Sequence, residues 1–258
     1  MKTLEESIAI AMDMQEVEIV PFLPYILQDF WEIGTSPETV IGFVQKHCGT
    51  VETQCIASLQ ILDLGCGKGA VSVKLAKHLN CNCLGIDGIP EFIATAKEKA
   101  REYNVETLCQ FEVGDIREKI KSLGKFDVIV LGAIGQVFGD YYATLTTLTQ
   151  HLAPNGIIII DDAYIENSST FQHPAILPHR EILAQIERTE MELIDECTDA
   201  ETAYAKEFEN LQKRCKELII KYPEKRTLFE NYIQVQTNEY NVLENDVVAS
   251  TMMLKRKA

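Results

Sequence analysis

From residue 59 onward, the chain alternates short apolar runs with longer amphipathic segments. Five runs have the length and composition of β-strands, namely residues 59–64, 82–87, 108–113, 126–132 and 156–161, and helical patterns separate them near 70–79, 89–103, 116–122 and 139–152. Val128–Leu131 and Ile157–Ile160 are apolar at every position, as in parallel strands that helices cover on both faces. The pattern therefore predicts a doubly wound α/β sheet joined by right-handed crossovers.

The remaining segments add two strands and two helical regions. Residues 1–57 are predicted to be helical, with a new helix that starts at Pro37 and has Ser36 as its N-cap. Beyond the fifth strand we expect a helix over 178–188, a strand over 191–197, a charged helical stretch over 200–242 that Pro223 interrupts, and a last strand over 247–254. We thus expect a helical N-terminal cap, an α/β core, a helical insertion and the final strand of the core, over residues 1–57, 58–198, 199–245 and 246–258 respectively.

The charge balance narrows the classes of partner. The chain is 46% hydrophobic and 24% charged, but 24 Lys and Arg stand against 39 Asp and Glu, which gives a formal net charge of −15. Because nucleic-acid binding depends on basic side chains that neutralise phosphates, this balance argues against DNA or RNA and favours a small-molecule substrate. The basic cluster at Lys255–Lys257 is expected to be a solvated tail.

The cysteines and the apolar runs indicate whether the protein holds a metal and in which cellular compartment it works. Cys81 and Cys83 fall on one face of a predicted strand, but no second pair follows at zinc-site spacing, so no metal is expected. Residues 1–6 lack the basic region and apolar run of a signal peptide, and the longest apolar run, near 157–160, is too short to cross a bilayer. We therefore expect a cytoplasmic protein with reduced thiols and no membrane partner.

The first predicted strand leads into a glycine-rich turn, Gly65-Cys-Gly67-Lys-Gly69. Glycines at a strand-to-helix turn permit tight backbone geometry and let a ligand approach the main chain closely. In an open parallel sheet, ligands bind at the carboxyl ends of the strands, where the strand order reverses. The turn is therefore a candidate binding site.

Two carboxylates flank this turn. Asp63 lies among apolar neighbours inside the end of the strand, where burial without a partner is costly, so a ligand that carries positive charge would suit it. Asp87 ends the second strand, 18 residues after Gly69, where a side chain can accept hydrogen bonds from two ribose hydroxyls. The alternative for Asp87 is an N-cap of the helix that starts near Ile89.

Four motifs in this order resemble those of the class I S-adenosylmethionine-dependent methyltransferases. Asp63–Gly69 resembles the first motif of the family, Gly85-Ile-Asp87 the acidic end of its second strand, Gly114-Asp-Ile116 the motif after its third strand, and Leu152–Gly156 the turn into its fifth. The resemblance covers about residues 58–162. It implies a Rossmann-like, seven-stranded, mostly parallel sheet with helices on both faces and an antiparallel last strand.

The resemblance also implies S-adenosyl-L-methionine as the cofactor. Asp63 would help to hold the amino end of its methionine part, Asp87 would bind the ribose hydroxyls, and Asp115 would accept from the adenine amino group. Further contacts with the cofactor would come from Gly65, Cys66, Gly67, Gly88, Ile116 and Gly132. Gly132, after the fourth strand, would line the methyl-transfer face. The alternative for Asp115 is an N-cap of the helix that begins at Ile116, and the two roles are compatible.

Two other functions stay open at this point. The glycines also satisfy the G-x-G-x-x-A pattern of NAD-dependent oxidoreductases. Against that function, the chain has no Tyr-x-x-x-Lys pair and no second domain long enough to hold a hydride acceptor, and Asp63 would lie close to an anionic pyrophosphate. The chain could also bind S-adenosylmethionine without catalysing a reaction.

The acceptor side is less defined. Asp161, Tyr164 and His173 lie beyond the strand ends and are candidates for a general base. Asp161-Asp162 occupies a position where some small-molecule O-methyltransferases hold a metal ligand, but the matching carboxylate after the fourth strand is missing. No Asn/Asp-Pro-Pro-aromatic tetrad follows that strand, which also favours a small-molecule acceptor.

The two helical segments outside the core are candidates for covering the site. Aromatic residues of segment 21–31 are expected to form a lid or to seal the core edge. The helical insertion is expected to form a second lid wall, a homodimer surface or a solvated helix pair.

Overall fold

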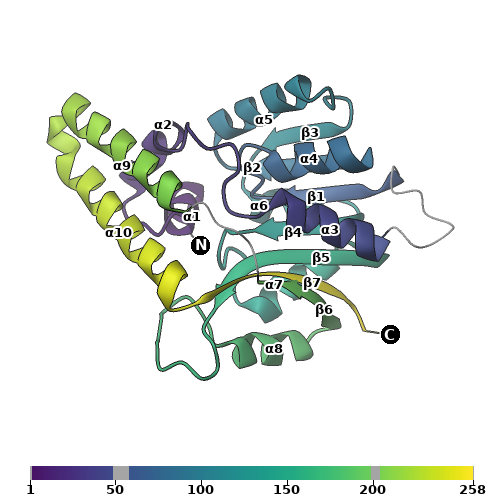
Figure 1. The fold of residues 1–258 in the computed structure, drawn as a ribbon. Helices are drawn as coiled ribbons and strands as arrows, with labels where there is room; N and C mark the ends of the chain where they lie inside the picture. Colours follow the sequence, from purple (N-terminus) through teal and green to yellow (C-terminus); the bar gives the residue numbers. More distant parts are fainter. Residues whose placement is uncertain (1, 49–57, 199–203, 258) are drawn as a thin grey trace. The chain divides into compact units, whose positions relative to one another are not determined.

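The computed structural model describes residues 2–48, 58–198 and 204–257 (Figure 1). The chain divides into two compact units, Met1–Trp31 with Glu201–Val247, and Glu32–Ala200 with Val248–Ala258. Segments from both ends of the sequence therefore contribute to each unit. Residues 32–48, which we had grouped with the N-terminal cap, belong with the sheet.

The second unit is built on a seven-stranded sheet. Its strands are β1 (Gln60–Leu64), β2 (Asn82–Asp87), β3 (Cys109–Val113), β4 (Phe126–Gly132), β5 (Leu152–Tyr164), β6 (Met191–Cys197) and β7 (Val248–Arg256). The strand order is β3-β2-β1-β4-β5-β7-β6. Neighbouring strands are parallel except for β7, which is antiparallel to both β5 and β6. The predicted fold class is confirmed.

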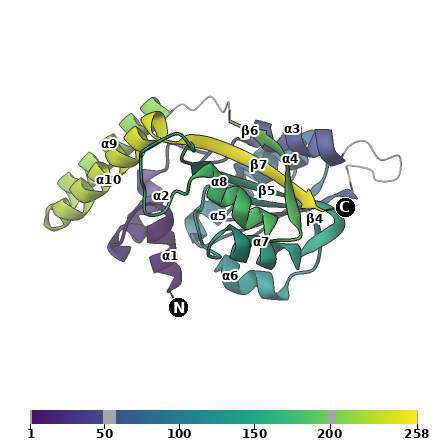
Figure 2. The same ribbon diagram turned by 90° about the horizontal axis from the view of Figure 1, so that it is seen from below.

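Helices cover both faces of this sheet (Figures 1 and 2). One face carries α3 (Pro37–Cys48), α4 (Ala70–Leu79) and α5 (Pro90–Glu102), and the other carries α6 (Ile116–Lys119), the 3-10 turn η3 (Ile120–Ser122), α7 (Tyr141–Thr149) and α8 (His179–Glu187). Alternate strand residues such as Leu62 and Ile158 pack into the core under α7 and α8. The predicted start of α3 is confirmed, since the Thr39 N–H donates to Ser36 Oγ at 3.3 Å.

The first unit is helical and joins two distant parts of the sequence. Its elements are α1 (Leu4–Ala11), η1 (Val17–Phe22), α2 (Leu23–Ile26), α9 (Tyr204–Lys221), η4 (Pro223–Lys225) and α10 (Arg226–Asn245). The Phe22 ring packs edge-on against Tyr222 and Phe229, at centroid distances of 5.5 and 5.0 Å. Arg214 of α9 makes a two-pronged ion pair with Asp29. Phe22 of segment 21–31 is thus partly buried and packs against the core of this unit.

The boundary between α7 and β5 differs from the predicted one. We expected a helix to residue 152 and a turn over Leu152–Gly156, but α7 ends at Thr149 and β5 already begins at Leu152. Leu152 pairs with Phe126 of β4, and the register then shifts between Phe126 and Val128. This pairing extends the strand, although Pro154 and Asn155 are poor strand formers.

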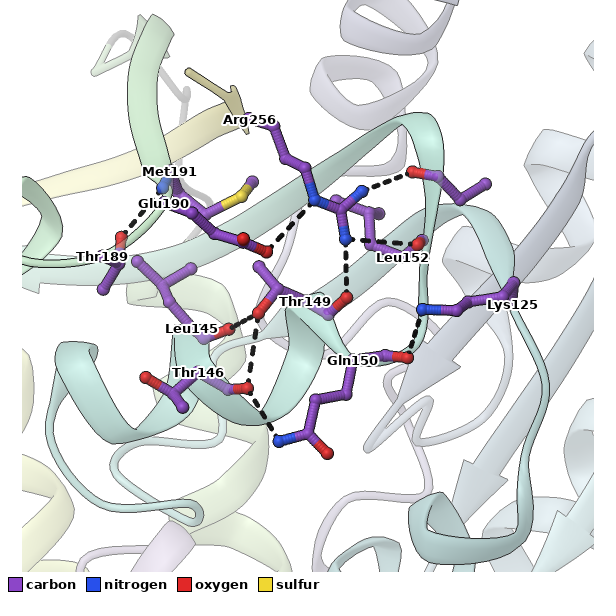
Figure 3. Close-up of polar contacts among 11 residues, drawn as sticks. Lys125, Leu145, Thr146, Thr149, Gln150, Leu152, Thr189, Glu190, Met191 and Arg256 are labelled. Carbon is purple, nitrogen blue, oxygen red and sulfur yellow. Dashed lines mark hydrogen bonds and ion pairs between the residues drawn. The ribbon is translucent and has the colours of Figure 1, made fainter. Parts of the chain in front are cut away.

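The basic C-terminal cluster is not the solvated tail that we expected. The Arg256 guanidinium donates to the carbonyl oxygens of Thr149, Ala153 and Leu152 at 2.7, 2.8 and 3.4 Å, and it pairs with Glu190 (Figure 3). Lys255 Nζ donates to the carbonyl of His47 in α3, and Lys257 Nζ donates to that of Glu187 in α8. The last turns of helices present unpaired carbonyls that attract cations, which explains why all three side chains fold back.

Candidate functional site

Parallel strands bring the predicted cofactor residues to one edge of the sheet. β1, β2, β4 and β5 run in the same direction, so their carboxyl ends meet there. The chain continues from β1 to β2 on one side, whereas β4 pairs with β1 on the other, so strand order reverses between β1 and β4. The glycine turn that follows β1 lies at this reversal, which is where ligands of such sheets bind.

The glycine turn adopts a backbone that favours glycine. Gly65, Gly67 and Gly69 have φ values of +72°, +52° and +75°. The N–H groups of Gly65 and Cys66 both donate to the carbonyl of Ile86 in β2, which fixes the turn to the neighbouring strand. A side chain at Gly67 would meet no atom within 4 Å, so the space beside this glycine is open to a ligand.

Asp63 is a buried carboxylate without a cationic partner in the described part of the chain. Its side chain is 3% exposed, and Ser72 Oγ in the first turn of α4 donates to Oδ2 at 2.6 Å. Burial raises its pKa to about 6, the Ser72 hydrogen bond opposes this shift, and the nearby Asp87 charge adds to it. The predicted suitability for a cationic ligand rests on this uncompensated charge.

Asp87 connects the glycine turn to the start of α5. Oδ2 accepts the N–H of Gly67 at 2.9 Å and Oδ1 accepts the N–H of Ile89 at 2.8 Å. The N-cap of α5 is Ile89 itself, so Asp87 is not that cap. An ionised carboxylate has about four acceptor positions, so two backbone bonds leave capacity for ligand hydroxyls. Burial raises the pKa of Asp87, and the two backbone hydrogen bonds oppose that shift.

Asp115 is already engaged at both oxygens. It N-caps α6 by accepting the N–H of Arg117, which is the alternative role that the sequence allows. The Arg117 guanidinium adds bonds to Oδ1 and Oδ2, the shortest of them 2.6 Å from Nη2 to Oδ2. These bonds hold the pKa of Asp115 below its usual range. An adenine amino group would have to share or displace these donors.

Residues near the carboxyl ends of β4 and β5 form a second polar group at the same edge. The sequence places Asp161 and Tyr164 beyond the end of the fifth strand, but β5 continues to Tyr164 because it pairs with β7 as far as Val248. Gly132 and Asp161 are register partners, and Thr251 of β7 pairs with Asp161 from the other side. Thr251 Oγ1 donates to Asp161 Oδ1 at 2.9 Å. Thr35, just before α3, packs directly on Gly132, since a Cβ at that glycine would lie 2.1 Å from Thr35 Oγ1.

The other acceptor-side residues make contacts with neighbouring side chains or with their own loop. Asp162 accepts a hydrogen bond from the Tyr141 hydroxyl of α7 at 2.9 Å. Tyr164 stacks on the His179 ring with a centroid distance of 4.2 Å. His173 Nδ1 accepts the N–H groups of Ala175 and Ile176, so that nitrogen is engaged in holding its own loop.

Three residues of this edge were missed by sequence reasoning. Both Ser72 and Arg117 contact carboxylates that are near in sequence. Arg117 lies two residues after Asp115 at the helix start, and Ser72 follows Asp63 across the glycine turn, so the predicted strand-turn-helix order could have pointed to them. Thr35 lies about 100 residues from Gly132 in sequence, and nothing in its local pattern indicates that contact.

Within the described residues, no group of three or more His, Cys, Asp or Glu side chains is placed to hold a metal ion. No helix of the described ranges has the length and apolarity to cross a membrane.

Comparison with known proteins gives a consistent result. Residues 57–246 match the sequence model of a family described as a methyltransferase domain. A ribosomal protein L11 methyltransferase of Thermosipho melanesiensis is 32% identical over 123 residues, which are 47% of this chain and 45% of that protein. A ubiquinone biosynthesis O-methyltransferase of Rickettsia akari is 31% identical over 106 residues, 41% of this chain and 40% of that protein. The chain thus spans less than half the length of these curated relatives.

Solved structures share the fold at low identity. An S-adenosylmethionine-dependent methyltransferase from Geobacter sulfurreducens, in complex with S-adenosyl-L-homocysteine, has a TM-score of 0.75 at 18% identity and covers 92% of this chain and 98% of its own. A similar complex from Thiobacillus denitrificans has a TM-score of 0.74 at 20% identity, over 92% of this chain and 99% of its own. These structures are similar to this chain in fold, and the acceptors named among the curated relatives differ from one another.

Proposed function

The chain belongs to the methyltransferase-domain family, within the class I S-adenosylmethionine-dependent methyltransferases, and we propose that it transfers a methyl group from S-adenosylmethionine to a small-molecule acceptor. The observation that carries this proposal is the pair of carboxylates at the glycine turn. Asp63 is buried without a cationic partner among the described residues, and Asp87 keeps acceptor capacity while holding Gly67. A nucleoside that carries positive charge fits both.

The residues present are suited to the cofactor. In this proposal Asp87 binds the ribose hydroxyls, because its two backbone bonds fix the carboxylate and leave further lone pairs. Asp63 provides negative charge for the methionine end, and the open space beside Gly67 lets the cofactor lie against the main chain. Asp115 and Ile116 border the adenine, with Arg117 holding the Asp115 carboxylate in place.

Bound S-adenosylmethionine supplies a methyl group that its sulfonium already activates. The protein therefore has to orient donor and acceptor in line and to exclude water, rather than to provide strong acid–base chemistry. The proposed acceptor position lies beside Gly132, the last residue of β4, and its register partner Asp161 in β5. A dinucleotide is disfavoured as the cofactor at the glycine turn, because its anionic pyrophosphate would approach the uncompensated charge of Asp63.

The acidic charge and the site favour a small molecule over a nucleic acid. We place the reaction in the reducing cytoplasm, in keeping with the free cysteines of the described ranges.

Methyl transfer itself is the test of this function. The chain is incubated with S-adenosylmethionine and a panel of small amines, phenols and carboxylic acids, and the release of S-adenosylhomocysteine is measured. We expect release above the no-enzyme rate with at least one acceptor class. Tight cofactor binding without release for any acceptor would favour the non-catalytic binding protein, and NADH oxidation by the chain would favour the oxidoreductase.

A further inference from the structure

Asp161 occupies a distinct position in β5, three residues before the strand ends at Tyr164. Its register partners are Gly132 of β4 and Thr251 of β7, and its side chain lies on the α3 face of the sheet, against Thr35 and Thr251. The neighbouring Asp162 points to the opposite face, where it accepts a bond from Tyr141. Asp161 keeps part of its surface exposed, so a ligand at this edge can reach it.

No Lys or Arg of the described chain forms an ion pair with Asp161. Burial raises the pKa of its carboxyl and the Asp162 charge adds to that shift, while the hydroxyls of Thr35 and Thr251 lower it. A carboxylate that is largely removed from water without a countercharge is costly, and such groups gather at functional sites. Asp161 therefore lacks a countercharge, and a positively charged group of a ligand could supply it.

Thr35 gives a second indication of a ligand beside the same carboxylate. Its side chain is 4% exposed, and its hydroxyl oxygen makes no hydrogen bond of ordinary geometry although it lies close enough to Asp161 to affect that carboxyl. A buried hydroxyl without a partner costs about 1–3 kcal/mol, and native proteins keep few of them. Its contact with Gly132 places it at the end of β4.

We propose that Asp161, Thr35 and Thr251 form a subsite that binds a protonated amine of the acceptor. An ammonium group has three donors and no acceptor. The subsite offers a matching set of acceptors, namely a carboxylate and two hydroxyl oxygens. An anionic group would be repelled by Asp161 and Asp162, and a neutral hydroxyl would leave the buried charge uncompensated.

This inference rests on the proposed function only in assigning the amine to the methyl acceptor. The substrate class that it names is a small cationic amine, whichever atom receives the methyl group. The subsite itself is a property of Asp161 and its two hydroxyl neighbours, so its binding chemistry can be measured with or without the cofactor product.

The test uses three aromatic probes of similar size, benzylamine, benzyl alcohol and benzoate, titrated at pH 7.5 into the full chain by calorimetry. Each titration is run with and without S-adenosylhomocysteine. We expect benzylamine to bind at least tenfold more tightly than benzyl alcohol, and benzoate not to bind. Asp161→Asn should remove the preference for the amine. Thr35→Val, which removes the hydroxyl at nearly constant volume, should weaken amine binding severalfold.

Asp162→Asn is the matched control, since it makes the same change one residue away on the other face and should keep the preference. Equal binding of amine and alcohol by the unmodified chain, or an amine preference that survives Asp161→Asn, would overturn the subsite. Absence of S-adenosylhomocysteine binding would count against the proposed function alone, because the amine preference is also read without that ligand. Circular dichroism verifies that each variant is folded before it is titrated.

Discussion

At the scale of single residues, the carboxylates of the ligand edge differ in how their charge is compensated. Asp115 has an arginine, whereas Asp63 and Asp161 have hydroxyl donors. Hydroxyls stabilise a carboxylate less than a cation does, so burial raises the pKa values of Asp63 and Asp161 while Arg117 lowers that of Asp115. The less compensated charges are those that we assign to cationic ligand groups.

The pKa of Asp63 leads to a pH-dependent affinity. A cationic ligand favours the ionised carboxylate, so binding releases a proton whenever the pH is below the pKa of about 6. The affinity for S-adenosylmethionine should therefore fall as the pH drops from 7.5 to 5, by at most about tenfold per pH unit. Calorimetric titrations across this range measure the slope.

Adenosine provides the control for this pH dependence, because it retains the ribose but lacks the sulfonium and ammonium charges. Its affinity should change less with pH, and in Asp63→Asn the two ligands should show the same pH dependence. A steeper slope for S-adenosylmethionine that persists in Asp63→Asn would show that another group is responsible.

The engagement of Asp115 by Arg117 predicts a small effect of its substitution. Because both oxygens already accept bonds from Arg117, we expect Asp115→Asn to weaken S-adenosylhomocysteine binding by less than about fivefold, well below the effect of removing a bond to a charged group. Equilibrium dialysis measures the dissociation constant, and thermal unfolding controls for loss of the α6 cap. A loss of a hundredfold or more would mean that adenine displaces Arg117 and depends on Asp115.

At the scale of elements, one contact at a helix end could be predicted from the sequence and another could not. The Ser36 cap could be predicted because capping is local, with donor and acceptor three residues apart. The Arg256 contacts could not, because they join the end of the chain to carbonyls more than 100 residues away. The start of β5 was missed for the same reason, since its first residue is fixed by pairing with Phe126.

The helix-end contacts of Arg256 predict a stability effect. Its guanidinium satisfies carbonyls at the end of α7 and the start of β5, so Arg256→Ala leaves them without this donor. We expect a loss of about 2 kcal/mol in the free energy of unfolding, from charge-assisted bonds and the helix-terminal charge. Urea denaturation measures it, with the exposed Lys121→Ala as a control near zero. Equal values for both variants would restore the solvated-tail interpretation.

At the scale of the whole molecule, alternation of strands and helices was sufficient to predict the sheet but not the composition of the units. A parallel sheet with both faces covered produces continuous apolar strands, which are visible in one sequence. The pairing of segment 1–31 with α9 and α10 depends on contacts such as Phe22 with Phe229, about 200 residues apart. Residues 49–57 and 199–203 of the expected cap and insertion lie outside the described ranges.

The division into two units predicts that each unit can lose its protection from amide hydrogen exchange separately. Phe229 is fully buried in the helical unit, and its truncation to alanine should destabilise that unit by about 3–5 kcal/mol. In hydrogen exchange read by mass spectrometry, we expect faster exchange in η1 and α2 and unchanged exchange in β1 and β4. Ile220→Ala, at a side chain that is 83% exposed, should change neither. Equal acceleration in β1 and β4 would show that the two units unfold together.

The proposed cofactor site depends above all on Asp87, to which we assign the ribose hydroxyls. The most direct measurement is calorimetric titration of S-adenosylhomocysteine into the unmodified chain, Asp87→Ala and Asp127→Ala. Asp127 is a matched carboxylate that accepts the Gln60 N–H at the opposite edge of the sheet. We predict a loss of affinity of at least tenfold for Asp87→Ala, as expected for bonds to a charged group, and little change for Asp127→Ala. Unchanged affinity in Asp87→Ala, or no binding by the unmodified chain, would contradict the account.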